Sequence, residues 1–148
     1  MICMSACNYF YNFFKEYKKK YDKVYIVVDV HNTILKPSFD KEETFEYFPY
    51  AKEVLRLFSQ HPDIVLIMWT GCYPDKLKMY KEHFESEGIN FKYVNENPEC
   101  QNSSYACLDQ KFYFDIGFDD RFGFNPIIEW KTIYEAIKYH VEGFVGIS

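Results

Sequence analysis

Short apolar runs and helical repeats alternate along this chain, with polar and turn-forming residues between them. Runs rich in β-branched and aromatic residues predict strands over residues 24–28, 64–69, 91–94 and 112–118. Apolar residues at three- and four-residue spacing predict helices over residues 6–20, from Pro49 to a break at His61, over residues 74–87 and over residues 128–141. Because helices connect the first three strands, we predict an α/β fold with a parallel sheet in the order 3-2-1-4 and helices on both faces.

Residues 1–148 are predicted to form one doubly wound, Rossmann-like domain without a large cap domain, because no segment between the strands is long enough for a cap. Residues 1–22 contain an amphipathic helix whose aromatic residues are Phe10, Phe13, Phe14, Tyr17 and Tyr21. A stripe of this kind predicts a helix packed on the sheet. An aromatic face with a lysine rim is also typical of a helix at a membrane interface, and this alternative stays open.

Composition narrows the classes of function. The net charge of −5 argues against general nucleic-acid binding, and no apolar run is long enough to span a membrane. The odd number of cysteines, without metal-binding spacing, favours free thiols in a reducing compartment. We therefore expect a cytoplasmic protein. Three large aromatic residues near strand ends and in the last helix are interpreted as core rather than as substrate-stacking residues: Trp69, Phe118 and Trp130.

Polar side chains gather at the ends of the predicted strands. They are Asp29 with His31 and Thr33 after the first strand, Thr70 after the second, Lys111, and Asp119 with Asp120 after the last. A carboxylate at the end of an apolar strand, as at Asp29, costs stability unless a cation or a chemical role compensates. Because the carboxyl ends of parallel strands meet at one edge of a sheet, we expect these groups to converge there.

The chemistry of these groups is complementary. Three carboxylates can hold a hard cation such as Mg²⁺, a hydroxyl and an ammonium can hold phosphate oxygens, and one carboxylate can act as a nucleophile. Each group alone also has a structural explanation as a cap, a turn or a surface ion pair. Their coincidence at one predicted edge favours a site.

Four segments together resemble the motifs of the haloacid dehalogenase (HAD) superfamily. DVHNT, which begins at Asp29, resembles the first motif DxDxT, and IVLIMWT resembles the second, a strand that ends in Ser or Thr. The segment KFYFDIGFDDR, from Lys111 to Arg121, is similar to the KxxxDxxxDDR of small capless members from bacteria and phages. The resemblance covers residues 24–140 and implies a HAD-like domain with Mg²⁺ as cofactor.

The resemblance implies a role for each matching position. Asp29 is the expected nucleophile and a metal ligand, and the expected catalytic groups beside it are His31, Thr70 and Lys111. The metal is expected to be held by Asp29, the backbone carbonyl of His31, Asp119 and Asp120. The residues expected to bind the substrate are Thr33, Gly71, Asn95 and Arg121.

His31 departs from the family pattern, because it stands where the second Asp of the motif normally acts as general acid. A backbone carbonyl survives any substitution, so metal binding is expected to persist. An imidazole is a competent acid near anions, but an imidazolium beside Mg²⁺ is unfavourable. The residues therefore leave both a working acid and a loss of efficient turnover open.

The expected function is that of a Mg²⁺-dependent phosphomonoester hydrolase, a phosphatase that acts through an aspartyl-phosphate on a phosphorylated small molecule or nucleotide. Nucleic acid is expected only as a phosphorylated end. The alternative is a catalytically impaired relative that binds a metal and a phosphorylated ligand or a protein partner. A receiver-type signalling domain is disfavoured, because its acidic pair follows the first strand, whereas here the pair comes last.

Overall fold

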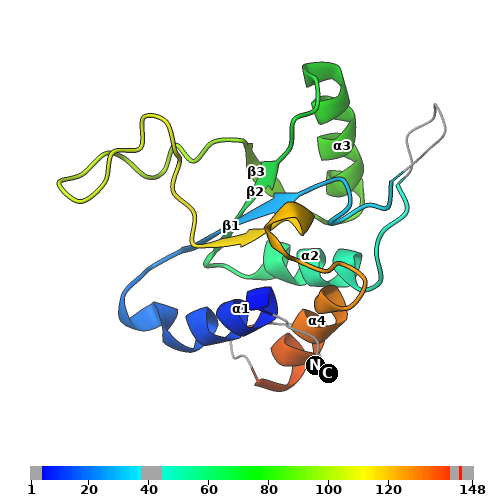
Figure 1. Ribbon diagram of the computed structural model, residues 1–148, viewed down its shortest axis with the longest axis horizontal. Helices are drawn as coiled ribbons and strands as arrows, with labels where there is room; N and C mark the ends of the chain where they lie inside the picture. The colour runs from blue at the N-terminus through cyan, green and yellow to red at the C-terminus, as the bar shows by residue number, and fades with distance from the viewer. Residues whose placement is uncertain (1–4, 38–44, 141–143, 145–148) are drawn as a thin grey trace.

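Four parallel strands form the centre of the protein, in a computed structural model that describes residues 5–37, 45–140 and 144. The strands are β1 (Val24–Asp29), β2 (Ile64–Trp69), β3 (Phe91–Val94) and β4 (Ile116–Phe118). Their spatial order is β3-β2-β1-β4, and every pair is parallel. The predicted strand order is confirmed, and the carboxyl ends of all four strands meet at one edge (Figure 1).

Four α-helices accompany the sheet: α1 (Ser5–Glu16), α2 (Ala51–Gln60), α3 (Pro74–Ser86) and α4 (Glu129–His140). A 3₁₀ turn, η1 (Tyr17–Lys19), continues α1, and a second, η2 (Asp120–Phe122), follows β4. Helices α1, α2 and α4 lie together on one side of the sheet (Figure 1). Among the described residues no helix is long and apolar enough to cross a membrane.

The aromatic stripe of α1 packs into the core. Phe10 is fully buried, with its ring centroid 4.7 Å from that of Phe14 and 5.6 Å from that of Phe58 in α2. Burying one Phe side chain contributes roughly 1.5–3 kcal/mol. The interpretation of this segment as a helix packed on the sheet is therefore confirmed.

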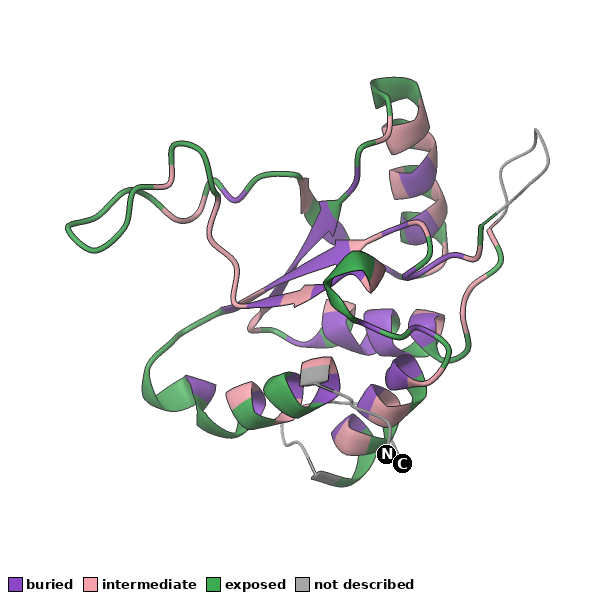
Figure 2. Cartoon of the chain, in the orientation of Figure 1, coloured by how far each residue is buried: buried purple, intermediate pink, exposed green. Residues whose placement is uncertain are grey.

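The two faces of the sheet are covered differently (Figure 2). All four helices contribute buried side chains to one core, among them Phe84 of α3 and Trp130 of α4. The other face carries a smaller cluster centred on Val27, covered by aromatic side chains that include Phe112 and Phe114. For the described residues, the prediction of helices on both faces is wrong. The connection from β3 to β4 covers the second face as an irregular segment, because its Asn, Ser and Pro residues favour turns over helix.

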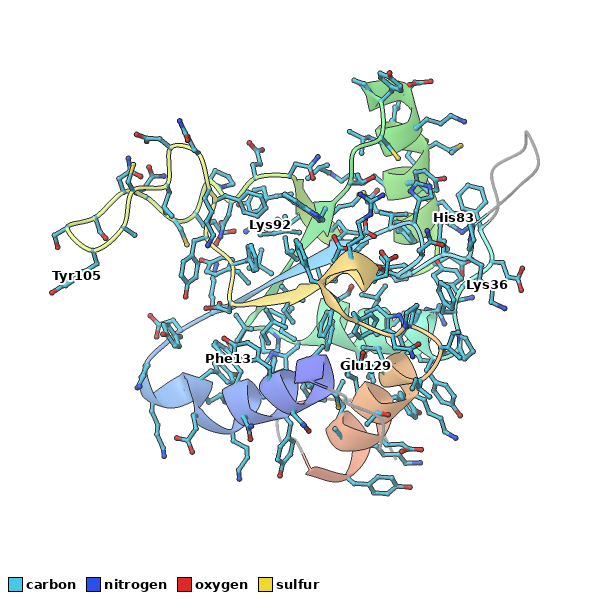
Figure 3. All side chains as sticks on the ribbon, in the orientation of Figure 1. Phe13, Lys36, His83, Lys92, Tyr105 and Glu129 are labelled. Carbon is cyan, nitrogen blue, oxygen red and sulfur yellow. The ribbon has the colours of Figure 1, made fainter. Side chains whose placement is uncertain are left out.

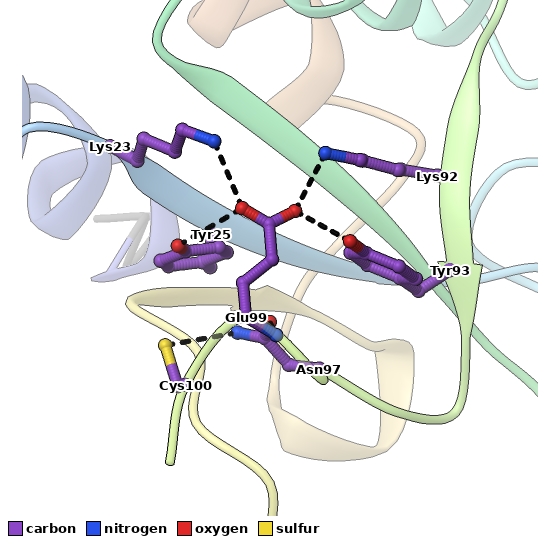
Figure 4. A network of polar contacts seen from close by, with 7 residues as sticks. All are labelled: Lys23, Tyr25, Lys92, Tyr93, Asn97, Glu99 and Cys100. Atoms are coloured by element: carbon purple, nitrogen blue, oxygen red, sulfur yellow. Dashed lines mark hydrogen bonds and ion pairs between the residues drawn. The ribbon is translucent and has the colours of Figure 1, made fainter.

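Glu99 fastens this connection to the strands (Figure 4). Its carboxylate accepts hydrogen bonds from Lys23 at 2.9 Å, Lys92 at 2.8 Å and Tyr93 at 2.7 Å. These charged donors hold the pKa of Glu99 at about 2. The irregular segment is thus attached to β3 and to the start of β1 by side-chain contacts rather than by a regular element.

Strand β4 is shorter than the predicted strand over residues 112–118. The backbone N–H of Asp115 donates to the carbonyl of Tyr25 at 2.8 Å, and the N–H of Tyr25 donates to the Asp115 carboxylate, also at 2.8 Å. A side chain therefore takes the acceptor position that a backbone carbonyl holds in a regular ladder. Regular pairing of β4 with β1 begins only at Ile116.

Candidate functional site

A pocket of about 720 Å³ opens at the carboxyl edge of the sheet. Its lining residues come from the ends of β1, β2 and β4 and from the loops that follow them. They are Asp29, His31, Asn32, Trp69, Thr70, Gly71, Cys72, Asn95, Asp119, Asp120 and Arg121. The structure therefore brings most of the sequence-predicted site residues together at the predicted edge.

Three carboxylates form the centre of this pocket. Asp29, Asp119 and Asp120 each offer an oxygen, and these oxygens lie within 4.8 Å of one another. Burial and the negative charge of Asp119 raise the pKa of Asp29 to about 7. Converging carboxylates of this kind repel one another unless a proton or a cation offsets their charge. The donor set, all oxygen and partly buried, fits a hard divalent cation.

Thr33 links Asp29, at the end of β1, to Asp120, which follows β4. Its hydroxyl donates to Asp29 at 3.2 Å and accepts from the backbone N–H of Asp120 at 3.1 Å. Its carbonyl accepts from the indole N–H of buried Trp130 at 2.7 Å. Thr33 is fully buried, so its position is set by both loops and by α4. The resemblance implied that Thr33 binds substrate. In the structure its hydroxyl instead holds Asp29 and the backbone of Asp120 in position.

Asn95 holds the end of β2. Its side-chain amide donates to the carbonyl of Thr70 at 2.6 Å, and its amide oxygen accepts from the backbone N–H of Thr70 at 2.9 Å. Asn95 has a φ of 55°, a left-handed conformation that Asn adopts more readily than most residues. Asn95 therefore lines the pocket as predicted and also fixes the backbone of the residue expected to bind the phosphoryl group.

His31 turns toward α3. Its Nε2 lies 2.9 Å from the hydroxyl of Tyr80, and its Nδ1 lies 3.9 Å from Sγ of Cys72. Sγ of Cys72 is in turn 3.2 Å from the hydroxyl of Thr70. Neither Tyr80 nor Cys72 was singled out from the sequence. Tyr80 is one of the buried residues of α3, and no local signal in the sequence indicated that it contacts His31.

Lys111 is the main departure from the predicted site. It does not line the carboxylate pocket but a neighbouring hollow, together with Phe112 and Phe122. The reason is the irregular path of residues 112–115, which join the sheet only at Ile116. The structure therefore does not bring Lys111 to the three carboxylates. Arg121 and Gly71 do line the pocket, so a cation still stands at its rim.

Trp69 also differs from its prediction. Phe118 and Trp130 are fully buried, as expected for core residues, but 37% of the surface of Trp69 is exposed. Trp69 ends β2 and lines the pocket. It is therefore available to a ligand, which the apolar run around it in the sequence did not indicate.

Comparison with known proteins finds one informative relative. The chain is similar to the solved structure of a conserved protein from Bacteroides thetaiotaomicron, with 28% sequence identity and a TM-score of 0.59. The match covers 78% of this chain and 90% of that one. No protein-family model matches the chain, and no curated protein matches it. The similarity supports an α/β fold with a four-stranded parallel sheet.

Proposed function

We propose that this protein is a HAD-like, Mg²⁺-dependent phosphomonoester hydrolase that acts through an aspartyl-phosphate. One observation carries the proposal: Asp29 ends β1 within a cluster of three carboxylates, in a pocket that Thr70 also lines. A half-buried carboxylate whose pKa is raised to about 7 by burial and by neighbouring acids is typical of functional sites. The motif order in the sequence supports the same conclusion.

In this proposal the metal would be held by Asp29, Asp119 and Asp120, with the backbone carbonyl of His31 as a further ligand. When bound, Mg²⁺ offsets the charge of the three carboxylates and of the phosphate oxygens. Beside such a cation Asp29 would be ionised at neutral pH, because a nearby positive charge favours the carboxylate over the acid. The phosphoryl oxygens are oriented by the hydroxyl of Thr70 and by Arg121 at the rim of the pocket.

The reaction then has two displacements at phosphorus. A carboxylate oxygen of Asp29 forms a bond to phosphorus while the bond to the leaving-group oxygen breaks, and that oxygen takes a proton. A water molecule next attacks the aspartyl-phosphate, gives up a proton and breaks the bond between phosphorus and Asp29. The products are the alcohol, inorganic phosphate and the regenerated carboxylate.

His31 is the proposed carrier of the leaving-group proton. It lines the same pocket as Asp29, and its ring is held by the hydroxyl of Tyr80. A histidine imidazole can both donate and recover a proton in general acid-base chemistry. The proposed substrate is a phosphorylated small molecule or nucleotide. The free thiols of Cys7, Cys72, Cys100 and Cys107 are consistent with the proposed cytoplasmic location.

A second candidate function follows from two departures from the family pattern described above. Lys111 lies outside the carboxylate pocket, and His31 replaces the expected acid. A protein with these departures can retain a metal and a phosphorylated ligand without efficient turnover. Such a protein would work by binding that ligand or a protein partner.

Hydrolysis of p-nitrophenyl phosphate with Mg²⁺ tests the proposal. We expect turnover by the wild type, loss of turnover in Asp29→Asn, and no change in Asp22→Asn, which makes the same substitution at an exposed position. Wild-type turnover that persists in Asp29→Asn would exclude Asp29 as the nucleophile. If the wild type binds Mg²⁺ and phosphate but shows no Asp29-dependent turnover with any metal or pH, the binding function is favoured.

A further inference from the structure

A second hollow lies beside the carboxylate pocket and shares two of its walls. It has a volume of about 480 Å³, and Trp69 and Asn95 line both spaces. Phe122 lines the hollow and directly follows Arg121, which lines the pocket. The two spaces therefore adjoin at Trp69 and Asn95 along the carboxyl edge of the sheet.

The walls of this hollow are aromatic. Four aromatic side chains line it: Trp69, Phe112, Phe114 and Phe122. The ring of Phe112 lies 5.7 Å from Trp69 and 5.9 Å from Phe114, measured between centroids. Phe122 is 74% exposed, and Trp69 is 37% exposed. Exposed aromatic groups that cluster beside a polar pocket are typical of ligand-binding surfaces.

The hollow exists because an irregular segment, rather than a helix, covers this face of the sheet. The second cluster, around Val27, is covered by Phe112 and Phe114 from that segment. The ring of Trp69 packs on Phe112, and both residues line the hollow. The aromatic lining of the hollow therefore reaches the carboxylate pocket at Trp69.

Lys111 is the charged residue of this lining, and it carries a positive charge. Within the described part of the chain, no hydrogen bond or ion pair is seen for its ammonium group. A cation among aromatic walls is complementary to a ligand that combines a planar ring with an anionic group. It is not complementary to a purely aliphatic chain.

We propose that this aromatic hollow, lined by Trp69, Asn95, Lys111, Phe112, Phe114 and Phe122, binds a planar aromatic ring in the leaving group of the substrate. The inference rests on the proposed function in one respect, since it assigns the phosphoryl group to the adjacent carboxylate pocket. The ring can be the base of a nucleotide or an aryl group nearer the ester oxygen. Stacking on an aromatic side chain is the shared chemistry of both.

Two matched pairs of substrates test whether the hollow binds an aromatic ring. Adenosine 5′-monophosphate is compared with ribose 5-phosphate, which lacks the base, and benzyl phosphate is compared with cyclohexylmethyl phosphate, which lacks planarity. We expect kcat/KM to favour the aromatic member by roughly ten- to a hundredfold, the size that base stacking on one aromatic side chain supplies. A preference in the first pair alone indicates a nucleotide, and a preference in the second pair alone indicates an aryl ester.

Phe122→Ala should bring the ratio of kcat/KM values within each pair closer to one, because it removes one ring of the hollow. Phe122 is exposed, so this change does not open the core. Tyr105→Ala is the matched control, since Tyr105 is an aromatic residue that is 97% exposed at the tip of the β3–β4 connection and does not line the hollow (Figure 3). We expect the control to keep the wild-type preference. Equal kcat/KM values within both pairs would overturn the inference and leave the hydrolase proposal intact.

Tryptophan fluorescence gives a readout that needs no turnover. The chain has two Trp residues, and Trp130 is fully buried, so quenching by an added ring reports on Trp69. With Mg²⁺ present, adenosine 5′-monophosphate should quench the emission more than ribose 5-phosphate does, and Phe122→Ala should weaken this quenching. If that result appears without hydrolysis of any substrate, the ring site stands and the hydrolase proposal fails. Absence of quenching, or a self-association that Phe122→Ala abolishes, would overturn the ring site.

Discussion

The hydroxyl of Tyr80 lies 2.9 Å from Nε2 of His31, and the two rings meet edge to face at 85°. Tyr80 is buried at 1% exposure in α3, so it fixes the ring of the less constrained His31. This contact joins the loop after β1 to the helix after β2. It fixes where the two ring nitrogens of His31 lie, and the proposed transfer of a proton from His31 depends on their position.

Replacing Tyr80 with Phe removes this hydrogen bond and keeps the buried ring. We expect kcat for an alkyl phosphate to fall about tenfold while KM changes little, because a loosened imidazole delivers its proton less often. The free energy of unfolding should fall by only about 1 kcal/mol, which denaturant titration measures. Equal kcat in wild type and Tyr80→Phe would show that the contact has no part in turnover.

Replacing His31 with Asn tests the acid itself. With an alkyl phosphate, whose leaving group needs a proton, we expect kcat to fall by roughly a hundredfold or more. With p-nitrophenyl phosphate the loss should be much smaller, because nitrophenolate leaves without protonation. Equal losses for both substrates would argue against an acid role. A large gain in rate for His31→Asp would instead identify His31 as an impairment.

The raised pKa of Asp29 predicts how the stability of the metal-free protein changes with pH. The ordinary pKa is 3.8 and the folded value is about 7, so between these pH values the folded protein keeps a proton that the unfolded chain has released. The unfolded chain therefore binds fewer protons, and stability falls as pH rises through this window, by on the order of 3 kcal/mol between about pH 5 and about pH 8.

Denaturant titration in EDTA at about pH 5 and about pH 8 measures this loss. Asp29→Asn should remove most of the difference, and Mg²⁺ should restore stability at the higher pH. The same pH dependence in Asp29→Asn as in the wild type would mean that another group causes it.

Magnesium binding should depend on the carboxylate pair after β4. We expect Asp120→Asn to weaken Mg²⁺ binding, measured by isothermal titration calorimetry, by more than the roughly tenfold that loss of an outer-shell partner costs. Asp22→Asn, at an exposed position, should bind Mg²⁺ like the wild type. Wild-type affinity in Asp120→Asn would exclude Asp120 as a ligand.

Glu99→Gln should loosen the connection from β3 to β4. Glu99 accepts from two lysines and from Tyr93, and a charged hydrogen bond contributes about 2 kcal/mol, so we expect a loss of this order at neutral pH. Glu96→Gln, at an exposed neighbouring position, is the control. The pKa of Glu99 is lowered from 4.5 to about 2. The stabilisation by its carboxylate is therefore complete above pH 4.5 and is lost as pH falls from 4.5 to about 2. A loss of stability as large in the control would contradict this role of Glu99.

The sequence by itself determined the strands apart from the start of β4, their order, and the meeting of Asp29 with Asp119 and Asp120 at one edge. These features follow from local hydrophobic periodicity and from the short helical connections that constrain a parallel sheet, and both are visible along the chain. The Mg²⁺ and phosphoryl-transfer hypotheses rest on the same residues.

Only the tertiary structure decided where Lys111 lies, that Trp69 is open to a ligand and that Tyr80 holds His31. Each depends on how segments distant in the chain pack together. The path of the β3–β4 connection is set by Glu99 on Lys23 and Lys92 and by Asp115 on Tyr25, across 76, 7 and 90 positions. Such contacts leave no periodic pattern in the sequence, because their energy comes from groups that are brought together only when the sheet forms.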